Sequence, residues 1–343
     1  MILTQKERLI AAIHREPVDR PPCICPGGMM NMMFQEIMEQ SQCFWPEAHQ
    51  DPEKMAGLAI ALNQAGGFEN YGVPFCMTVE AEAMGAKVDM GSLLVEPHVV
   101  ESPLRSVEEV EQLQSLDVHQ GRVKVVLDAI RLLKDQNHDH VPIVGNITGP
   151  VSTAGTLIDM SVLLKEYRKK PEASHRFMTK VTDEIIKYAQ GEADAGADMI
   201  CISEPSGTGE ILGPKFFREY SIRYVNRILD AVNVPVKLVH ICGDLRSVYH
   251  ILSEFHSDAF SFDSIVPIAE IKPHIPEKAV VGNINTHAIG TQMPEKVRSL
   301  VRFARRKGVD VVAPACGLPT TTPLANVQAM VKAAAEGSLS VVK

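Results

Sequence analysis

The 343-residue sequence predicts a (β/α)₈ TIM barrel. Short β-branched runs alternate with longer stretches of helical periodicity over more than 300 residues, and eight such runs can be identified. The segments "AGAD" at 195–198 and "KGVD" at 307–310 each end a helix with glycine shortly before the next strand. An open doubly wound sheet is the alternative, but no G-x-G-x-x-G segment follows an early strand, which weakens it.

The predicted strands are short apolar runs bounded by proline, glycine or aspartate. They cover residues 22–26, 75–79, 142–147, 198–203, 236–242, 259–262, 279–284 and 309–313. Helical periodicity is clearest over residues 172–195, 213–232 and 294–307. Residues 26–72 and 80–140 fit the alternation poorly, and we expect them to form N-terminal helical and irregular elaborations around the barrel mouth. Because no low-complexity linker divides the chain, a single domain over residues 1–343 is predicted.

The charge and the apolar pattern exclude several classes of partner. A formal net charge of −8 argues against nucleic acid, because phosphate binding needs a basic face. No stretch approaches the roughly 18 uninterrupted apolar residues of a membrane span, and the N-terminal segment lacks a signal-peptide core. Seven cysteines at wide spacings do not form a disulfide framework. We therefore expect a reduced, soluble, cytoplasmic protein; the sequence is also compatible with an oligomer.

A candidate metal site lies at the ends of two predicted strands. The strand "VKLVHICG" carries His240 and Cys242, which point to the same face because they are two residues apart. Cys316, in "VVAPACGLP", follows the last strand, and the C-terminal ends of barrel strands meet at one rim. One imidazole and two thiolates are three ligands for Zn²⁺ with a fourth position open, which is typical of catalytic zinc. The alternative is a satisfied core histidine with buried cysteines, which is the usual explanation for any one such residue.

The donor set favours thiol chemistry. Zn²⁺ with two thiolates and a neutral imidazole has a formal charge of zero, and a bound substrate thiolate would bring it to −1. A metal lowers the pKa of a bound thiol enough to deprotonate it, while sulfur ligands keep that sulfur nucleophilic. A hydrolase would instead favour histidine and carboxylate ligands, which leave zinc a stronger Lewis acid for water. The pattern therefore indicates activation of a thiol rather than of water.

With "HICG" and "PACGLP", the chain resembles the uroporphyrinogen decarboxylase superfamily, and within it the methylcobamide:coenzyme M methyltransferases with their His-x-Cys…Cys zinc motif. The resemblance covers nearly the whole chain and includes "LTQKERLIAAIHREPVDRPP", "GNITGP", "ISEPSGTGEILGPKFFREY" and "VVGNIN". It implies zinc on His240, Cys242 and Cys316, and a thiolate that takes a methyl group from a methylated corrinoid. Because the chain has no Asp-x-His-x-x-Gly segment, we expect the methylcobalamin to arrive on a partner corrinoid-binding protein.

Two other reactions stay open within this resemblance. Relatives of the superfamily demethylate O- or N-methylated donors and load the methyl group onto a corrinoid protein; two cysteine ligands count against the ether-cleaving members. A uroporphyrinogen decarboxylase-like enzyme would carry the arginine-bearing "RQAGRY" segment after the first strand, where this chain has "CPGGMMN". Tetrahydrofolate as methyl acceptor and a non-catalytic subunit with structural zinc are further alternatives. The small thiol favoured here is coenzyme M.

Two carboxylates at strand ends are candidate catalytic residues. Glu204, in "SEPSGTGE", could be a transient fourth zinc ligand or a proton acceptor; the structural alternative is a carboxylate that caps a helix or holds a loop. Asp263, in "FSFDS", could orient His240 through its second ring nitrogen, as metal-binding histidines usually require. Capping of the next helix is its alternative.

Three further polar residues are candidates for holding the corrinoid or the substrate. Asn146 and Asn283 lie at strand ends in "GNITG" and "GNINT", where turn formation explains them equally well. Thr322 belongs to "GLPTTTP", just before a helix predicted to start at Pro323. A sulfonate or carboxylate on the thiol substrate could dock at that helix N-terminus. Capping of its own helix is the alternative role for Thr322.

Overall fold

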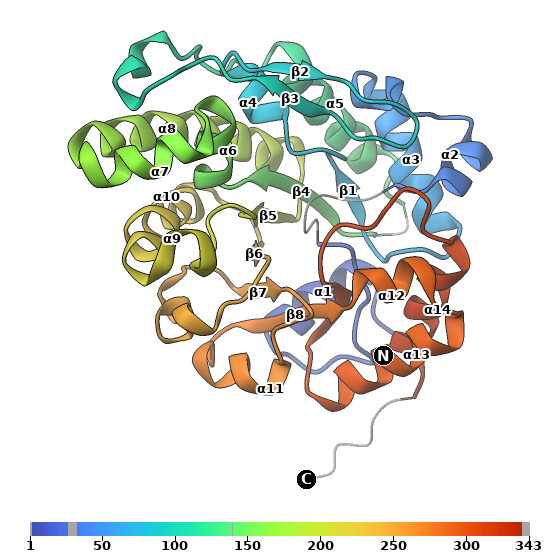
Figure 1. The fold of residues 1–343 in the computed structure, drawn as a ribbon. Helices are drawn as coiled ribbons and strands as arrows, with labels where there is room; N and C mark the ends of the chain where they lie inside the picture. The colour runs from blue at the N-terminus through green and yellow to red at the C-terminus, as the bar shows by residue number, and fades with distance from the viewer. Residues whose placement is uncertain (1, 27–32, 139, 338–343) are drawn as a thin grey trace.

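The computed structural model describes residues 2–26, 33–138 and 140–337. Seven parallel strands curl into a barrel in the order β1-β4-β5-β6-β7-β8-β9, and helices pack around its outside (Figure 1). The strands are β1 (Tyr71–Val73), β4 (Ile143–Thr148), β5 (Met199–Ser203), β6 (Val236–Ile241), β7 (Ala259–Phe262), β8 (Ala279–Ile284) and β9 (Val311–Pro314). The six predicted strands from residue 142 onward are therefore confirmed to within a few residues.

The segment around Cys23 takes the eighth place, between β9 and β1. Cys23 forms an isolated parallel bridge with Val312, whose N–H donates to Pro22 O at 2.9 Å and whose carbonyl accepts from Ile24 N at 3.0 Å. On its other side, Cys23 O accepts from Glu69 N at 2.9 Å. The predicted strand at 22–26 is thus reduced to a bridge, because the prolines that bound it have no N–H to extend a ladder.

The second predicted strand, at 75–79, is wrong. The strand is β1, which ends at Val73 immediately before Pro74, and residues 75–78 form a loop into helix α4 (Val79–Ala83). Pro74 cannot donate to a ladder, so pairing stops there and the apolar residues that follow pack as a loop.

A two-stranded antiparallel hairpin that the sequence did not predict lies outside the barrel sheet. It consists of β2 (Lys87–Asp89) and β3 (His98–Glu101), and its side chains are mostly exposed. Its tip approaches the loop after β9, where Thr320 Oγ1 donates to Leu94 O at 3.4 Å (Figure 1). The N-terminal elaboration therefore includes a β arm beside the barrel mouth.

The helices follow the predicted alternation with one change. Helix α8 (Pro171–Ala195) and helix α13 (Pro294–Arg306) are where periodicity predicts them. The predicted helix at 213–232 is broken into α9 (Gly209–Phe216), a π-helical turn at Phe217–Ile222 and α10 (Arg223–Ala231), with Gly213 at φ 67° inside α9. The other helices are α1 (Gln5–Ile13), α2 (Gln35–Ser41), α3 (Pro52–Gln64), α5 (Gly121–Asp135), α6 (Pro150–Leu157), α7 (Met160–Lys169), α11 (Ile268–Ile271), α12 (Thr286–Thr291) and α14 (Leu324–Ala335).

Two apolar cores hold the barrel together. The larger lies between the sheet and the surrounding helices. The smaller fills the barrel interior, where Leu9, Ala12 and Ile13 of α1 pack against the first inward-facing residues of the strands. Helix α1 therefore plugs the N-terminal end of the barrel (Figure 1). Within the described ranges, no helix is both long and apolar enough to cross a bilayer.

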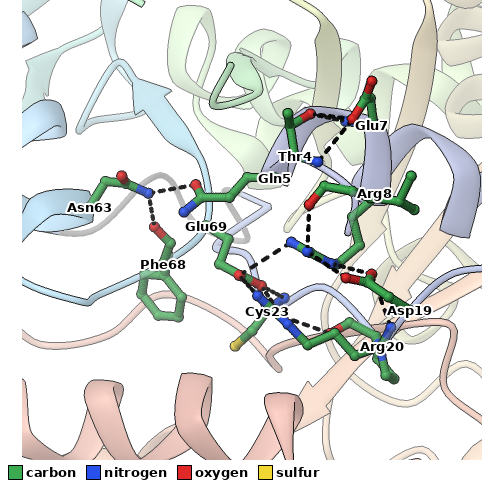
Figure 2. Close-up of polar contacts among 12 residues, drawn as sticks. Thr4, Gln5, Glu7, Arg8, Asp19, Arg20, Cys23, Asn63, Phe68 and Glu69 are labelled. Atoms are coloured by element: carbon green, nitrogen blue, oxygen red, sulfur yellow. Dashed lines mark hydrogen bonds and ion pairs between the residues drawn. The ribbon is translucent and has the colours of Figure 1, made fainter. Parts of the chain in front are cut away.

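An ion-pair network ties the plug and the eighth segment to the wall (Figure 2). Arg8 binds both carboxylate oxygens of Asp19, at 2.8 and 2.9 Å, and this pairing lowers the pKa of Asp19 to about 2. The Arg20 guanidinium forms two hydrogen bonds with the carboxylate of Glu69, and Glu69 also accepts from Cys23 N at 2.9 Å. The buried Glu69 charge is thus neutralised by arginine and held against the backbone that closes the barrel.

Candidate metal centre

One layer of the barrel interior is polar. Val236 and Leu238 of β6 point into the interior core, so His240, two residues further along the same strand, points inward as well. In the sheet register His240 pairs with Ser203 of β5 on one side and with Ser261 of β7 on the other. All three are fully buried. This layer lies at the C-terminal ends of the strands, where barrel enzymes hold their reactive groups.

The structure brings the three predicted metal ligands together. His240 Nε2 lies 3.0 Å from Cys242 Sγ, and Cys242 Sγ lies 3.0 Å from Cys316 Sγ. The ligand atoms all lie within 4.8 Å of one another, and no other group of three histidine, cysteine or acidic residues in the described chain meets that condition. Tetrahedral zinc with these donors needs separations of roughly 3.5–3.8 Å. Small side-chain movements reach that spacing, so the donor set fits zinc.

Local backbone geometry presents the two thiols. Cys242 comes directly after β6 and is followed by Gly243, whose φ of 80° turns the chain away from the barrel axis. A side chain at Gly243 would also collide with the carboxylate of Glu210. Cys316 lies in the loop immediately after β9. Glycine is therefore required at the turn that leaves the Cys242 sulfur at the mouth.

The pKa values of the two thiols are shifted in opposite directions. The hydrogen bond between them lowers the pKa of Cys316 and raises that of Cys242, and His240 lowers the pKa of Cys316 further. One sulfur is thus readily available as a thiolate, which is the form that binds metals. Burial raises the pKa of Glu96, at the base of the hairpin tip, and the charge of Cys316 raises it further. The β arm therefore brings a carboxylate into the electrostatic field of the thiols.

Ser261, rather than Asp263, contacts the second nitrogen of His240. His240 Nδ1 lies 2.9 Å from Ser261 Oγ. Asp263 is therefore not the group at His240 Nδ1 in this structure, and its predicted role at the site stays a prediction. Asp263 accepts from Ile265 N at 3.1 Å and from Ser264 Oγ at 3.3 Å, so it organises the loop that follows β7. It lies one residue past the end of β7, beyond the layer in which His240 meets its neighbours.

Glu204 lies at a helix N-terminus. Its carboxylate is fully buried and accepts from Val151 N at 2.9 Å and from Ser152 N at 2.7 Å, and the Ser152 hydroxyl also donates to it. These donors belong to the first turn of α6, so the capping alternative describes its contacts. Burial raises the pKa of Glu204 to about 7. It is not among the atoms grouped at the thiols, and its role as a zinc ligand or proton acceptor stays a prediction.

The two asparagines occupy different environments. Asn146 is fully buried in β4, in line with the inward-facing Val144. Asn283 donates to Asp263 O at 3.0 Å and to Val266 O at 2.9 Å, so its amide fixes the loop after β7, as expected for turn formation. It also lines a cavity of about 420 Å³ between α11 and α13. Corrinoid or substrate contacts by either residue stay predictions.

Thr322 does not cap the helix that follows it. Helix α14 begins at Leu324, its N-cap position is Pro323, and the Thr322 side chain is buried with no hydrogen-bond partner for Oγ1. Leu324 N instead donates to Glu36 Oε1 of α2 at 2.9 Å. A carboxylate of the protein itself thus occupies the position predicted to receive a substrate anion.

Sequence reasoning missed Ser261 and Glu96. Ser261 could have been found from the register, because parallel neighbours at the same distance from the strand ends face each other. Glu96 had no comparable signal, because the hairpin that carries it lacks the apolar alternation of a half-buried strand.

Comparison with known proteins agrees with this architecture. The family profile described as "Uroporphyrinogen decarboxylase (URO-D)" matches residues 4–337. The chain belongs to the uroporphyrinogen decarboxylase family. Within this family, it is 34% identical over 336 residues to the methylcobamide:CoM methyltransferase MtbA of Methanosarcina acetivorans, covering 96% of this chain and 97% of that protein. It is 33% identical to the methylcobamide:CoM methyltransferase MtaA of Methanosarcina barkeri, with the same coverage of both chains.

A solved structure of a methyltransferase shares the fold. A methyltransferase from Methanosarcina mazei superimposes with a TM-score of 0.90 at 31% identity, covering 97% of this chain and 98% of that one. The predicted (β/α)₈ barrel and the resemblance to the methylcobamide:coenzyme M methyltransferases are both confirmed.

Proposed function

We propose that this protein is a zinc-dependent methyltransferase that moves a methyl group from a methylated corrinoid protein to a small thiol, with coenzyme M as the favoured acceptor. The observation that carries the proposal is the convergence of His240, Cys242 and Cys316 at the barrel mouth, in a chain similar over its whole length to methylcobamide:CoM methyltransferases. We further propose that residues 1–343 form one domain and that the protein acts in the cytoplasm.

The proposed ligands are His240 Nε2 and the two cysteine sulfurs. Bound zinc would supply the Lewis acidity that lowers the pKa of the substrate thiol. The protein contributes a neutral imidazole and two thiolates, so the site reaches only −1 when the substrate sulfur is a thiolate. With zinc held by these side chains, that sulfur would lie at the mouth, where a methyl donor on another protein could reach it.

The proposed reaction is an in-line displacement at carbon. The substrate thiolate forms a new S–C bond, the C–Co bond of the methylated corrinoid breaks, and its electron pair stays on cobalt as Co(I). The thiol proton passes to solvent before transfer. Such a displacement needs the methyl carbon at near-attack distance from the sulfur, so the corrinoid protein must dock over the mouth.

Zinc analysis and zinc-edge X-ray absorption of the purified protein, with and without coenzyme M, test the proposal. We expect one equivalent of zinc and an added sulfur ligand when coenzyme M is present. A closed four-ligand zinc that does not respond to the thiol, or the absence of zinc, would contradict the proposal. An added sulfur ligand would also separate this reaction from an ether-demethylating one, because the thiol would then be the acceptor.

The variant Cys316→Ala should lose zinc and fall to background methyl transfer from methylcobalamin to coenzyme M, with its melting temperature nearly unchanged. Cys201→Ala is the matched control, because Cys201 is a buried cysteine of the barrel interior below the proposed site. It should keep its zinc. Full activity in Cys316→Ala would contradict the assignment of the ligands.

A further inference from the structure

We infer that Ser261 is the positioning residue that orients His240, so that Nε2 of the imidazole faces the two thiols. This inference rests on the proposed function, and it names a residue that acts on the site through His240. Ser261 lies on β7, one strand away from the histidine.

The register places Ser261 directly opposite His240. Below this level, the paired positions Cys201, Leu238 and Ala259 on the same three strands are all part of the apolar interior core. One level higher, the strands present Ser203, His240 and Ser261. The change from an apolar to a polar layer occurs in one step, at the level of the imidazole.

Both ring nitrogens of His240 have a defined neighbour. Nδ1 lies 2.9 Å from Ser261 Oγ, and Nε2 lies 3.0 Å from Cys242 Sγ. A neutral imidazole carries one N–H and one lone pair. When Nδ1–H donates to Ser261 Oγ, the lone pair is on Nε2 and points at the thiols, as metal ligation requires. Because the ring is fully buried, an unpaired Nδ1–H would be costly, and this stabilises the ring orientation.

The choice of serine also matters for charge. Histidine ligands commonly donate to a carboxylate, which adds a negative charge beside the metal. The proposed site already has two thiolates and takes up a third with the substrate. A neutral hydroxyl orients the ring without adding further negative charge, so it leaves the substrate thiolate less strongly repelled.

Ser203 supplies a matched control. It pairs with His240 from the opposite side, is equally buried and has the same side chain. Its Oγ lies 3.9 Å from Cys201 Sγ, while the two nitrogens of His240 are directed at Ser261 and Cys242. If removing any hydroxyl group from this layer weakened zinc binding, Ser203→Ala would therefore show the same loss.

The test measures zinc affinity by competition with a chromophoric chelator, and the His240 ring by ¹⁵N NMR, in the full-length protein. Ser261→Ala should bind zinc about 10–100-fold more weakly. It should also lose the exchange-protected Nδ1 proton of the zinc-loaded protein. Ser203→Ala should stay within about twofold of the wild type. Ser261→Thr, which keeps the hydroxyl, should recover most of the affinity.

Three results would overturn the inference. They are a Ser261→Ala variant with wild-type zinc affinity and an unchanged Nδ1 signal, an equal loss in Ser203→Ala, or no recovery in a folded Ser261→Thr. Failure of the proposed function has a different signature, because the wild type itself would then bind no zinc. The ¹⁵N spectrum of metal-free wild type and Ser261→Ala would still report whether Ser261 holds the ring.

Discussion

The polar groups at the two ends of the barrel differ in whether they have partners of opposite charge. At the N-terminal end, Glu69 is matched by Arg20 and by a backbone N–H, and Asp19 is matched by Arg8. At the C-terminal end, two thiols and an imidazole lie against one another. Carboxylates that are paired with arginines stabilise the fold. An imidazole and two thiols in contact are instead suited to bind a metal ion. The ion-pair network that stabilises the fold and the proposed metal site thus lie at opposite ends of the barrel strands.

The largest effect on stability is expected at the N-terminal end. Glu69→Ala would leave the guanidinium of Arg20 and the N–H of Cys23 without their acceptor, and should lower the free energy of unfolding by about 3–5 kcal/mol. The zinc content of the folded fraction should not change. Urea unfolding and metal analysis of the same samples check both parts.

Glu101→Ala is the control for that variant, because Glu101 and Lys87 form an exposed pair on the hairpin with their charges 4.0 Å apart. Its unfolding free energy should change by less than about 0.5 kcal/mol. An equally small change in the unfolding free energy of Glu69→Ala would show that the ion-pair network of Figure 2 does not hold α1 in the barrel.

The second prediction concerns a buried carboxyl group in the outer wall. Burial raises the pKa of Glu192 on α8, and the nearby Glu80 raises it further. Between the pKa in the unfolded chain and the raised pKa in the fold, the folded state binds more protons, so stability falls as pH rises through that window. Each unit of such a shift corresponds to about 1.4 kcal/mol.

Glu192→Gln should therefore flatten the pH dependence of the unfolding free energy at pH values above 4.5, the ordinary pKa of the group. It should be more stable than the wild type at the upper end. Glu172→Gln, an exposed position on the same helix, should keep the wild-type slope. Parallel slopes for wild type and Glu192→Gln would show that Glu192 ionises normally.

The smallest effect is expected from Asp263→Asn. Because Ser261 lies against His240 Nδ1, loss of the Asp263 charge should change zinc affinity by less than about threefold. A chelator competition measures this directly, next to Ser261→Ala. A tenfold or larger loss in Asp263→Asn would return the orienting role to the carboxylate.

The sequence was sufficient for the features that depend on local pattern. The apolar runs of β4 to β9 and the periodicity of α8 and α13 follow from spacing alone. The rule of residues two apart on one face placed His240 beside Cys242. The position of Cys316 followed from strand ends meeting at one rim. The "CPGGMMN" segment, used to argue against a decarboxylase, lies largely outside the described residues.

The remaining features depend on tertiary contacts. The strand predicted at 75–79 lies instead at Tyr71–Val73, because Pro74 ends the pairing before the apolar run that follows it. Glu204 became a cap because α6 begins beside it, and Thr322 lost its capping role because Glu36 reaches Leu324 N from a helix almost 300 residues away. Neither contact is encoded in the local sequence around the residue.

The plug formed by α1 also constrains the kinetics of the proposed reaction. With Leu9, Ala12 and Ile13 filling one end of the barrel, the described part of the chain leaves the C-terminal rim as the way to the proposed site. A small thiol and a bulky methyl donor would then both approach the site from that rim. If the corrinoid protein docks over that rim as proposed, the thiol would enter before it and the methylated product would leave after it, so the order of addition would be compulsory. The product-inhibition patterns would then be those of an ordered mechanism.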